Sequence, residues 1–313
     1  MTTGDANRIP VAEVEVTDAL VAALLTSQHP DLARLDLRAA AHGWDNVIYR
    51  LGDALSIRLP RRAAGAVLVE HEQRWLPELA PRLPLPIPTP LRVGVPEFGY
   101  PWRWSVTPWF DGDVAADVEL ADPTREARRL GGFMAALHDV APADAPSNPA
   151  RDGFVGDRRD RFEAARAQVS KVLDELAPSG ADRAGERWAE LVTTDPFDGP
   201  PTWVAGDVHA ANVIIADGEI CAVIDFGDLC AGDPAVDLAV AWMLFDASDR
   251  NVFRDAASRG RVPVDQAMWR RAEAWAWYFA VMYLANSADD PRLERMGRSL
   301  ASVLLRTSSD GLD

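Results

Sequence analysis

The chain has 313 residues, of which 48% are hydrophobic and 26% are charged, so a folded protein with a sizeable core is expected and a largely disordered one is excluded. Its 48 acidic and 32 basic residues give a net charge of −16, which argues against a nucleic-acid-binding protein, because phosphate contacts need an excess of Lys and Arg. The same charge is compatible with a cationic small-molecule partner. Residues 1–10 lack the charged and apolar regions of a signal peptide, and the longest apolar run is too short to span a bilayer. We therefore expect a cytoplasmic protein.

The first 110 residues are predicted to form a small, β-rich lobe. A helix is expected over 17–28, followed by antiparallel strands around 35–39, 47–49 and 55–59, the last two joined by a turn at Gly52-Asp53. Apolar residues then recur at helical spacing over 65–80. Five prolines between 81 and 90 indicate an extended connector, and two further strands are expected at 91–95 and 104–109.

From residue 111 onward the pattern is mostly helical. Asp122-Pro123 is a good helix start, and helices are predicted over 122–138, 157–176, 182–193 and most of 234–306. Strand signals at 203–204, 213–215 and 220–224 interrupt them, with Asp217-Gly218 as a hairpin turn. We therefore predict an α+β fold of two lobes, 1–110 and 111–313, with a ligand site in the cleft between them.

The segment 203–237 carries the densest set of chemically useful residues. Asp207 and Asn212 are five positions apart in a loop between strands, and Asp225 follows the hairpin and opens Asp225-Phe226-Gly227. Phosphoryl transfer needs one carboxylate beside the attacking hydroxyl, and an amide and a second carboxylate to hold Mg²⁺ against the nucleotide phosphates. The spacing matches the catalytic and metal loops of kinases.

In this segment the chain resembles the aminoglycoside phosphotransferase family, which has a protein-kinase-like fold. The family patterns H-G-D-x-x-x-x-N, I-D-[WF]-G and G-D-x-x-x-D-L correspond to 205–212, 224–227 and 232–238, with Ala205 in place of the histidine. The resemblance implies that Asp207 is the catalytic base, that Asn212 and Asp225 bind Mg²⁺, and that Asp233 and Asp237 support the loop. It also implies a kinase that transfers the γ-phosphoryl group of ATP or GTP to a hydroxyl of an aminoglycoside-like acceptor, the chemistry of antibiotic resistance.

The resemblance also assigns nucleotide-binding residues in the first lobe. The family usually has a lysine on the third strand to hold the α- and β-phosphates, but Lys171 is the only lysine in the chain, and Arg58 stands at the strand position. Glu72, with Glu70 as second choice, is expected to orient Arg58 from the following helix. The loop from His42 to Asn46 would cover the phosphates. The backbone of 106–110 would meet the nucleotide base, and Trp109, Trp102 and Trp104 are candidates to line its pocket.

Several alternatives remain open at the level of sequence. The acceptor could be a macrolide, another sugar, or an amino alcohol such as choline or homoserine, and a nucleotide-binding pseudoenzyme is a candidate from another class. The protein could be a monomer or a dimer, with no nucleic-acid or membrane partner expected. Cys221 and Cys230 are interpreted as inert thiols. The acceptor is expected between the catalytic loop and the C-terminal helices, near acidic residues at 228, 246, 249, 273, 289 and 290.

Overall fold

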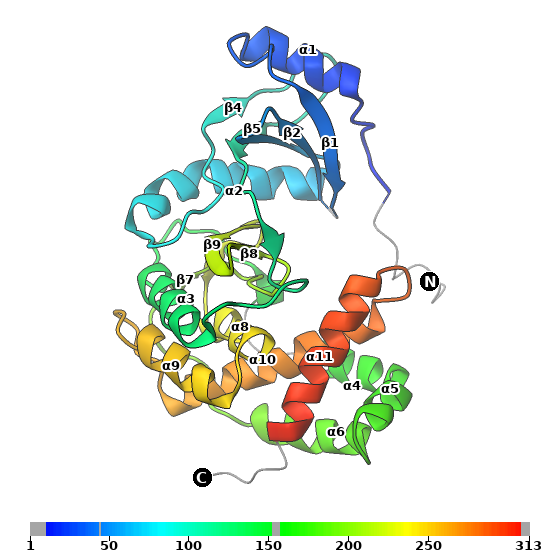
Figure 1. Cartoon of the computed structure of the whole chain (residues 1–313), viewed down its shortest axis with the longest axis vertical. Coiled ribbons are helices and arrows are strands. Elements are labelled where there is room, and N and C mark those ends of the chain that lie inside the picture. The colour runs from blue at the N-terminus through cyan, green and yellow to red at the C-terminus, as the bar shows by residue number, and fades with distance from the viewer. Residues whose placement is uncertain (1–10, 44, 152–156, 308–313) are drawn as a thin grey trace.

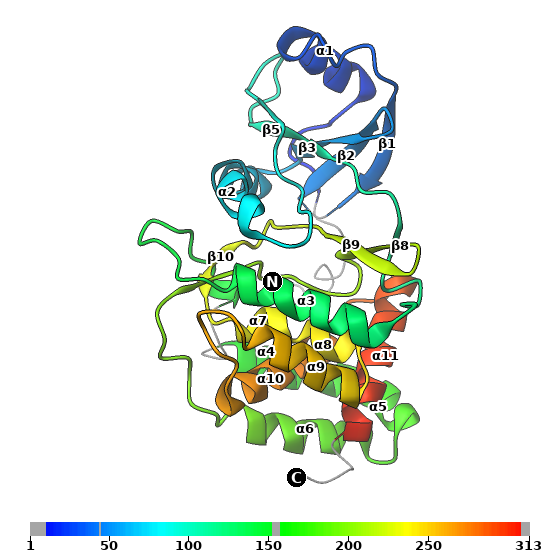
Figure 2. The ribbon, with the colours of Figure 1, turned by 60° about the vertical axis from the view of Figure 1, so that its left-hand side comes forward.

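A computed structural model describes residues 11–43, 45–151 and 157–307 and has two lobes, stacked along the long axis of the molecule (Figures 1 and 2). The first lobe holds a five-stranded antiparallel sheet of order β1-β2-β3-β5-β4. Its strands are β1 (Leu37–His42), β2 (Asn46–Leu51), β3 (Leu55–Pro60), β4 (Arg92–Gly94) and β5 (Trp104–Pro108). Helix α1 (Asp18–Gln28) covers one face of this sheet, capped by the Thr17 hydroxyl.

The core of the first lobe follows from the alternation of side chains along the strands. Val47, Tyr49 and Leu51 are buried on one face of β2, where they pack with Ile57 of β3 and with α1. Trp104 of β5 lies in the same core and is fully buried, directly opposite Gly94 of β4. The strand register also fixes the position of Arg58 in the sheet, where it is paired with Ile48 of β2 and with Ser105 of β5.

Helix α2 (Ala63–Leu79) lies between the sheet and the second lobe. Pro77 falls in its last turn, and the helix passes into a short 3-10 turn at Ala80–Arg82, so the proline accompanies the helix end. The C-terminal part of α2 packs into the core of the second lobe, where Trp75 meets Trp203 edge to face at 5.0 Å between ring centroids. The proline-rich connector that follows has no helix or strand up to β4.

The second lobe is mostly helical and carries short strands beside the cleft. Helix α3 (Pro123–Leu137) begins after the Asp122 cap and packs on α9 (Ala247–Ala257). Strands β8 (Val213–Ala216) and β9 (Glu219–Val223) form the predicted hairpin, in which Asp217 and Gly218 both have positive φ. The other helices are α4 (Asp157–Gln168), α5 (Ser170–Leu176), α6 (Gly180–Leu191), α7 (Ala235–Leu238), α8 (Val240–Leu244), α10 (Gln266–Ala285) and α11 (Pro291–Thr307).

Three local features differ from the sequence predictions. The single helix expected over 157–176 is broken at Val169, whose φ of −100° and ψ of 10° leave the helical range, so α4 and α5 are separate. Strands β6 (Asp113–Val114) and β10 (Cys230–Gly232) were not predicted, because two or three residues carry no readable alternation. They pair with β8 and with β7 (Thr202–Val204), respectively. In the described part of the chain, no helix has the length and hydropathy needed to cross a membrane.

Candidate active site

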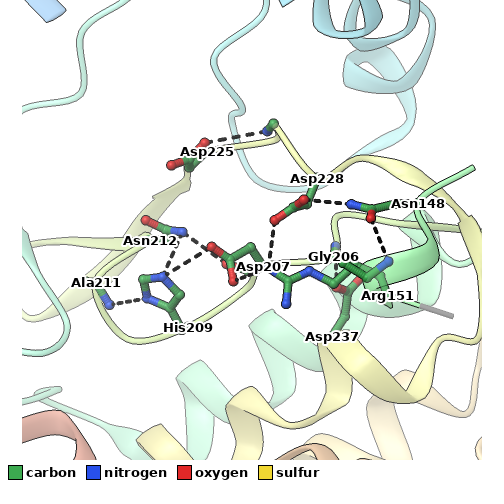
Figure 3. Close-up of polar contacts among 12 residues, drawn as sticks. Asn148, Arg151, Gly206, Asp207, His209, Ala211, Asn212, Asp225, Asp228 and Asp237 are labelled. Atoms are coloured by element: carbon green, nitrogen blue, oxygen red, sulfur yellow. Dashed lines mark hydrogen bonds and ion pairs between the residues drawn. The ribbon is translucent and has the colours of Figure 1, made fainter. Parts of the chain in front are cut away.

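The loop between β7 and β8 is shaped by its own side chains. His209 accepts a hydrogen bond from the backbone N–H of Ala211 through Nδ1, at 3.1 Å, and its Nε2 lies 3.1 Å from Asn212 Nδ2. The same Asn212 nitrogen donates to the backbone carbonyl of Asp207 at 3.0 Å. His209 and Asn212 thus close the loop on one side, as Figure 3 shows. His209 Nε2 also lies 3.6 Å from Asp207 Oδ2, which places that ring in a supporting position.

A buried carboxylate accepts hydrogen bonds from the backbone at the start of this loop. Asp237 of α7 is fully buried and accepts hydrogen bonds from the backbone N–H groups of Ala205 and Gly206, both at 2.8 Å. His138, at the end of α3, contacts the same carboxylate at 3.2 Å. Gly206 has a φ of +84°, and a Cβ atom there would lie 2.7 Å from the Asp228 carbonyl oxygen, so a side chain would not fit. Asp237 therefore supports the loop structurally.

Asp225 follows β9 in a left-handed backbone conformation, with a φ of +62°. This conformation is unfavourable for a residue with a Cβ atom, and such residues concentrate at functional sites. Its side chain is half exposed and lies on the same cavity as Asp207 and Asn212. That cavity lies between the lobes and has a volume of about 580 Å³. The structure thus brings together the three residues for which base and metal roles were predicted; the roles themselves stay predictions.

On the first-lobe side of the cavity, Arg58 and Glu72 form the expected ion pair, with 3.1 Å between Nη1 and Oε1. Both side chains are buried. Burial raises the pKa of Glu72 to about 7, although the Arg58 guanidinium opposes this change. The second terminal nitrogen of Arg58, Nη2, lies 3.4 Å from Asp225 Oδ1. Arg58 therefore connects the sheet, helix α2 and the candidate metal loop.

A second cavity of about 400 Å³ adjoins the first through Ile48, Arg58 and Asp225, which line both. Trp109 and Phe110 line its wall after β5, where the nucleotide base was expected. Asn46 lines the larger cavity. Trp104 does not line either cavity because its ring fills the core of the first lobe, and Trp102 packs against Tyr100. Trp44, within the expected phosphate-covering loop, lies outside the described residues.

Sequence reasoning missed one group of residues at this site. Arg151, at the end of a 3-10 turn (Pro149–Arg151), donates from Nη2 to Asp207 Oδ1 at 3.0 Å and to Asp228 Oδ2 at 2.6 Å. Asn148 donates to the other oxygen of Asp228 at 2.7 Å. Burial alone would raise the pKa of Asp207, but the neighbouring His209 and Arg151 outweigh it and hold that pKa below its usual value. Asp207 is therefore ionised at neutral pH.

The acidic residues expected near an acceptor separate into two groups. Asp228 and Asp290 line the larger cavity. Asp246 instead caps α9, Asp249 accepts a hydrogen bond from Thr124, and Glu273 pairs with Arg187. Asp289 is exposed and lines neither cavity. The acceptor side of the cavity also includes Arg292, Leu293 and Met296 of α11, so its charge is mixed.

The donor atoms at the expected metal position suit Mg²⁺. The Asn212 amide nitrogen makes the two contacts that close the loop, which leaves its oxygen without a partner in the described structure. Asp225 Oδ2 is likewise without a partner there, while Oδ1 faces Arg58. Mg²⁺ prefers oxygen ligands and is commonly held by one or two carboxylate or amide groups together with substrate phosphates. Asn212 and Asp225 are a protein set of this kind.

A five-stranded lobe, a helical lobe and a carboxylate-lined cavity between them define a fold of the protein-kinase type. Comparison with protein families agrees, because residues 36–275 match the model of the phosphotransferase enzyme family. The chain belongs to this family and is a small-molecule phosphotransferase. Comparison of the sequence with curated proteins gives no match.

Solved structures share the fold over nearly the whole chain. The GDP and kanamycin complex of APH(2")-IIia is 17% identical, with a TM-score of 0.63, and the match covers 92% of this chain and 98% of that chain. The streptomycin–ATP–APH(2")-IIa ternary complex is 18% identical, with a TM-score of 0.56 and coverages of 93% and 99%. The apoenzyme of macrolide 2'-phosphotransferase MphH from Brachybacterium faecium is 24% identical, with a TM-score of 0.52 and coverages of 85% and 93%.

Proposed function

We propose that this phosphotransferase moves the γ-phosphoryl group of ATP or GTP to a hydroxyl group of a small acceptor. The observation that carries the proposal is the convergence of Asp207, Asn212 and Asp225 on one cavity, whose opposite wall holds the buried pair of Arg58 and Glu72. Neighbouring structures of the same fold contain GDP or ATP, which supports a nucleoside triphosphate as co-substrate. The cytoplasm, where these nucleotides are abundant, is the expected place of the reaction.

Asp207 is proposed as the base. The acceptor oxygen forms a bond to the γ-phosphorus, the bond between that phosphorus and the β,γ-bridging oxygen breaks, and the acceptor proton passes to Asp207, with the nucleoside diphosphate as leaving group. Because Asp207 is ionised at neutral pH, it can accept this proton. Since the transition state is loose, the main task of the site is to position the reactants and neutralise charge.

The remaining residues hold the nucleotide. Asn212 and Asp225 would hold Mg²⁺, which supplies neutralisation of phosphate charge. Arg58, oriented by Glu72, would contact phosphate oxygens, for which a planar guanidinium is a good donor. Asn46 would lie near the phosphates and Trp109 near the base, since each lines one of the two adjoining cavities. The boundary near residue 110 between a nucleotide-binding and a catalytic lobe belongs to the same proposal.

An aminoglycoside-like compound is the first candidate acceptor. Kanamycin and streptomycin are present in structures of the same fold, and Asp228 and Asp290 would face amino groups of such a molecule. A macrolide is the second candidate, because MphH, at 24% identity, is a macrolide 2'-phosphotransferase and because Leu293 and Met296 give the cavity an apolar wall. Monomeric and dimeric states are both compatible with this reaction.

The test is acceptor-dependent release of nucleoside diphosphate from Mg-ATP and Mg-GTP, over a panel of aminoglycosides, macrolides and amino alcohols. Asp207→Asn keeps the shape of the loop and should lower kcat by about 10²–10⁴-fold, since that is the usual contribution of a general base. Nucleotide binding by the variant should be unchanged. Nucleotide binding by the wild-type protein with no turnover of any acceptor would favour a pseudoenzyme, and absence of nucleotide binding would contradict the proposal.

A further inference from the structure

Arg151 lies at the candidate base but has no part in the mechanism described above. Its Nη2 atom donates to both Asp207 and Asp228, at 3.0 and 2.6 Å, and Asn148 holds Asp228 from the other side at 2.7 Å (Figure 3). The side chain is only 16% exposed, and its guanidinium lies 5.8 Å from the centre of the Phe279 ring. Arg151 is thus a fixed cation that reaches the candidate base from a separate segment.

Most of the donors of this guanidinium are not used within the described protein. Both contacts to carboxylates come from Nη2, whereas Nε is buried without a partner and Nη1 has no partner among the described residues. An arginine has five N–H groups in one plane, so three of them are unused by the described residues; the one on Nε is buried, and the other two are on Nη1. Arg151 also lines the larger cavity. A planar set of unused donors beside the base suits an anionic, oxygen-rich group.

The other arginines that line this cavity in the described structure are committed elsewhere. Arg58 is held by Glu72 at 3.1 Å and by Asp225 at 3.4 Å, on the first-lobe side. Arg292 pairs with Asp117 at 2.7 Å. Arg151 is the arginine in direct contact with Asp207, and therefore the one nearest to the place where an acceptor oxygen would meet the transferred group.

We propose that Arg151 is a catalytic residue that donates hydrogen bonds to the transferred phosphoryl group in the transition state. This inference rests on the proposed function. In a loose transition state the negative charge is spread over three phosphoryl oxygens. An arginine that reaches these oxygens stabilises the transition state more than it stabilises the bound nucleotide of the ground state. Contact with Arg151 weakens Asp207 as a base. This loss is tolerable because charge neutralisation and positioning supply most of the catalysis in phosphoryl transfer.

A purely structural role for Arg151 makes a different prediction. If the guanidinium served only to hold Asp207 and Asp228 in place, its removal would disturb the loop and weaken every ligand of the cavity alike. If it contacts the transferred group, its removal should weaken only ligands that resemble the transition state. Tetrafluoroaluminate, bound with MgADP or MgGDP, mimics the transferred phosphoryl group and needs no identified acceptor.

The experiment measures the dissociation constant of MgADP and MgGDP, with and without tetrafluoroaluminate, for the full-length wild-type protein and three variants. In the wild type, the fluoride complex should tighten diphosphate binding by about tenfold or more, as expected for an analogue of the transition state. Arg151→Gln should reduce this tightening to about twofold or less while diphosphate binding alone changes little, and Arg151→Lys should give an intermediate value because it keeps the charge. Arg159→Gln is the matched control, since Arg159 is exposed and bonds the Val192 carbonyl.

Each outcome has a defined meaning. Full tightening in Arg151→Gln would contradict the proposal, as would wild-type protein that binds the diphosphate without any effect of tetrafluoroaluminate. Equal losses of diphosphate binding and of tightening in Arg151→Gln would assign Arg151 a structural role and also overturn the proposal. Failure of the wild-type protein to bind either diphosphate would instead contradict the proposed function itself, and the inference with it.

Discussion

Arg58 joins three parts of the molecule through one side chain. It is buried on β3 and faces Glu72 of α2 and Asp225 of the candidate metal loop. A lysine ammonium is a compact point charge, whereas a guanidinium can meet two carboxylates with separate nitrogens. The two terminal nitrogens of Arg58 do so here. The arginine is therefore suited to this position by geometry, in a chain that has a single lysine.

Substitutions of Arg58 and Glu72 should have strongly coupled effects on the free energy of unfolding. Arg58→Met leaves the buried Glu72 carboxyl group without its partner and should cost about 3–5 kcal/mol of unfolding free energy. Glu72→Leu leaves Arg58 its contact with Asp225 and should cost less. The double variant Arg58→Met/Glu72→Leu removes both charges and should be much less destabilised than the sum of the single changes. Denaturant unfolding of the four proteins measures this coupling, and additive losses would show that the two side chains act independently.

Cys230 should be chemically inert in the folded protein. Burial raises the pKa of this thiol to about 12, and the thiolate is the reactive form. At pH 8 its thiolate fraction would be about 1000-fold lower than that of a thiol with an ordinary pKa near 9. Iodoacetamide labelling followed by mass spectrometry should modify the half-buried Cys221 first and Cys230 only after unfolding in urea. Labelling of Cys230 at the rate of a free thiol would contradict its burial.

The sequence could indicate some site residues and not others, for a physical reason. One short segment contains Asp207, Asn212 and Asp225, so their spacing alone indicated a shared site. Arg58 and Glu72 lie on consecutive elements, β3 and α2, so their pairing could also be predicted. Arg151 is 56 positions before Asp207 and 77 before Asp228, in a polar, proline-rich stretch without periodicity. Such a contact depends on tertiary packing, and no local pattern in the chain predicts it.

At the scale of elements, the close approach of the Trp104 ring to the backbone of β4 explains why position 94 is a glycine. A Cβ atom there would lie 1.8 Å from the ring of Trp104, which is fully buried on the paired strand. Gly94→Ala should therefore force Trp104 out of place and cost about 1–3 kcal/mol. Gly132→Ala, within α3 and with no atom near the added Cβ, should instead be neutral or stabilise by up to about 1 kcal/mol. Unfolding curves of the two variants test this, and equal stability would contradict the tight packing at Gly94.

Elements with strong local signals were predicted well. The Asp217-Gly218 turn and the helix start at Asp122 each have a cause within a few residues. The break between α4 and α5 at Val169 was missed because 157–176 contains neither proline nor glycine. Trp102, Trp104 and Trp109 look alike in sequence, but of these three only Trp109 lines the smaller cavity, whereas Trp104 lies within β5 and enters the core.

At the scale of the whole molecule, two hydrophobic cores correspond to the two lobes, and helix α2 contacts both lobes although its core residues belong to the second. Its middle carries Glu72 toward the first-lobe sheet, while Trp75, Leu76 and Leu79 pack in the core of the second lobe. The connector after it is also tied down, since Pro86 accepts a hydrogen bond from the backbone N–H of Val223 at 3.1 Å. The proposed boundary near residue 110 therefore separates the lobes along the chain, and core packing crosses it.

This position of α2 between the lobes has a consequence for heat denaturation. Because α2 holds Arg58 of the sheet through Glu72 and packs Trp75 in the second core, melting of either lobe breaks contacts of this helix with the other. Calorimetry should therefore record a single endotherm with equal calorimetric and van't Hoff enthalpies. Trp75→Ala removes a large contact on the second-lobe side of α2 and should split that endotherm into two. Two separate endotherms in the wild-type protein would mean that the lobes unfold independently.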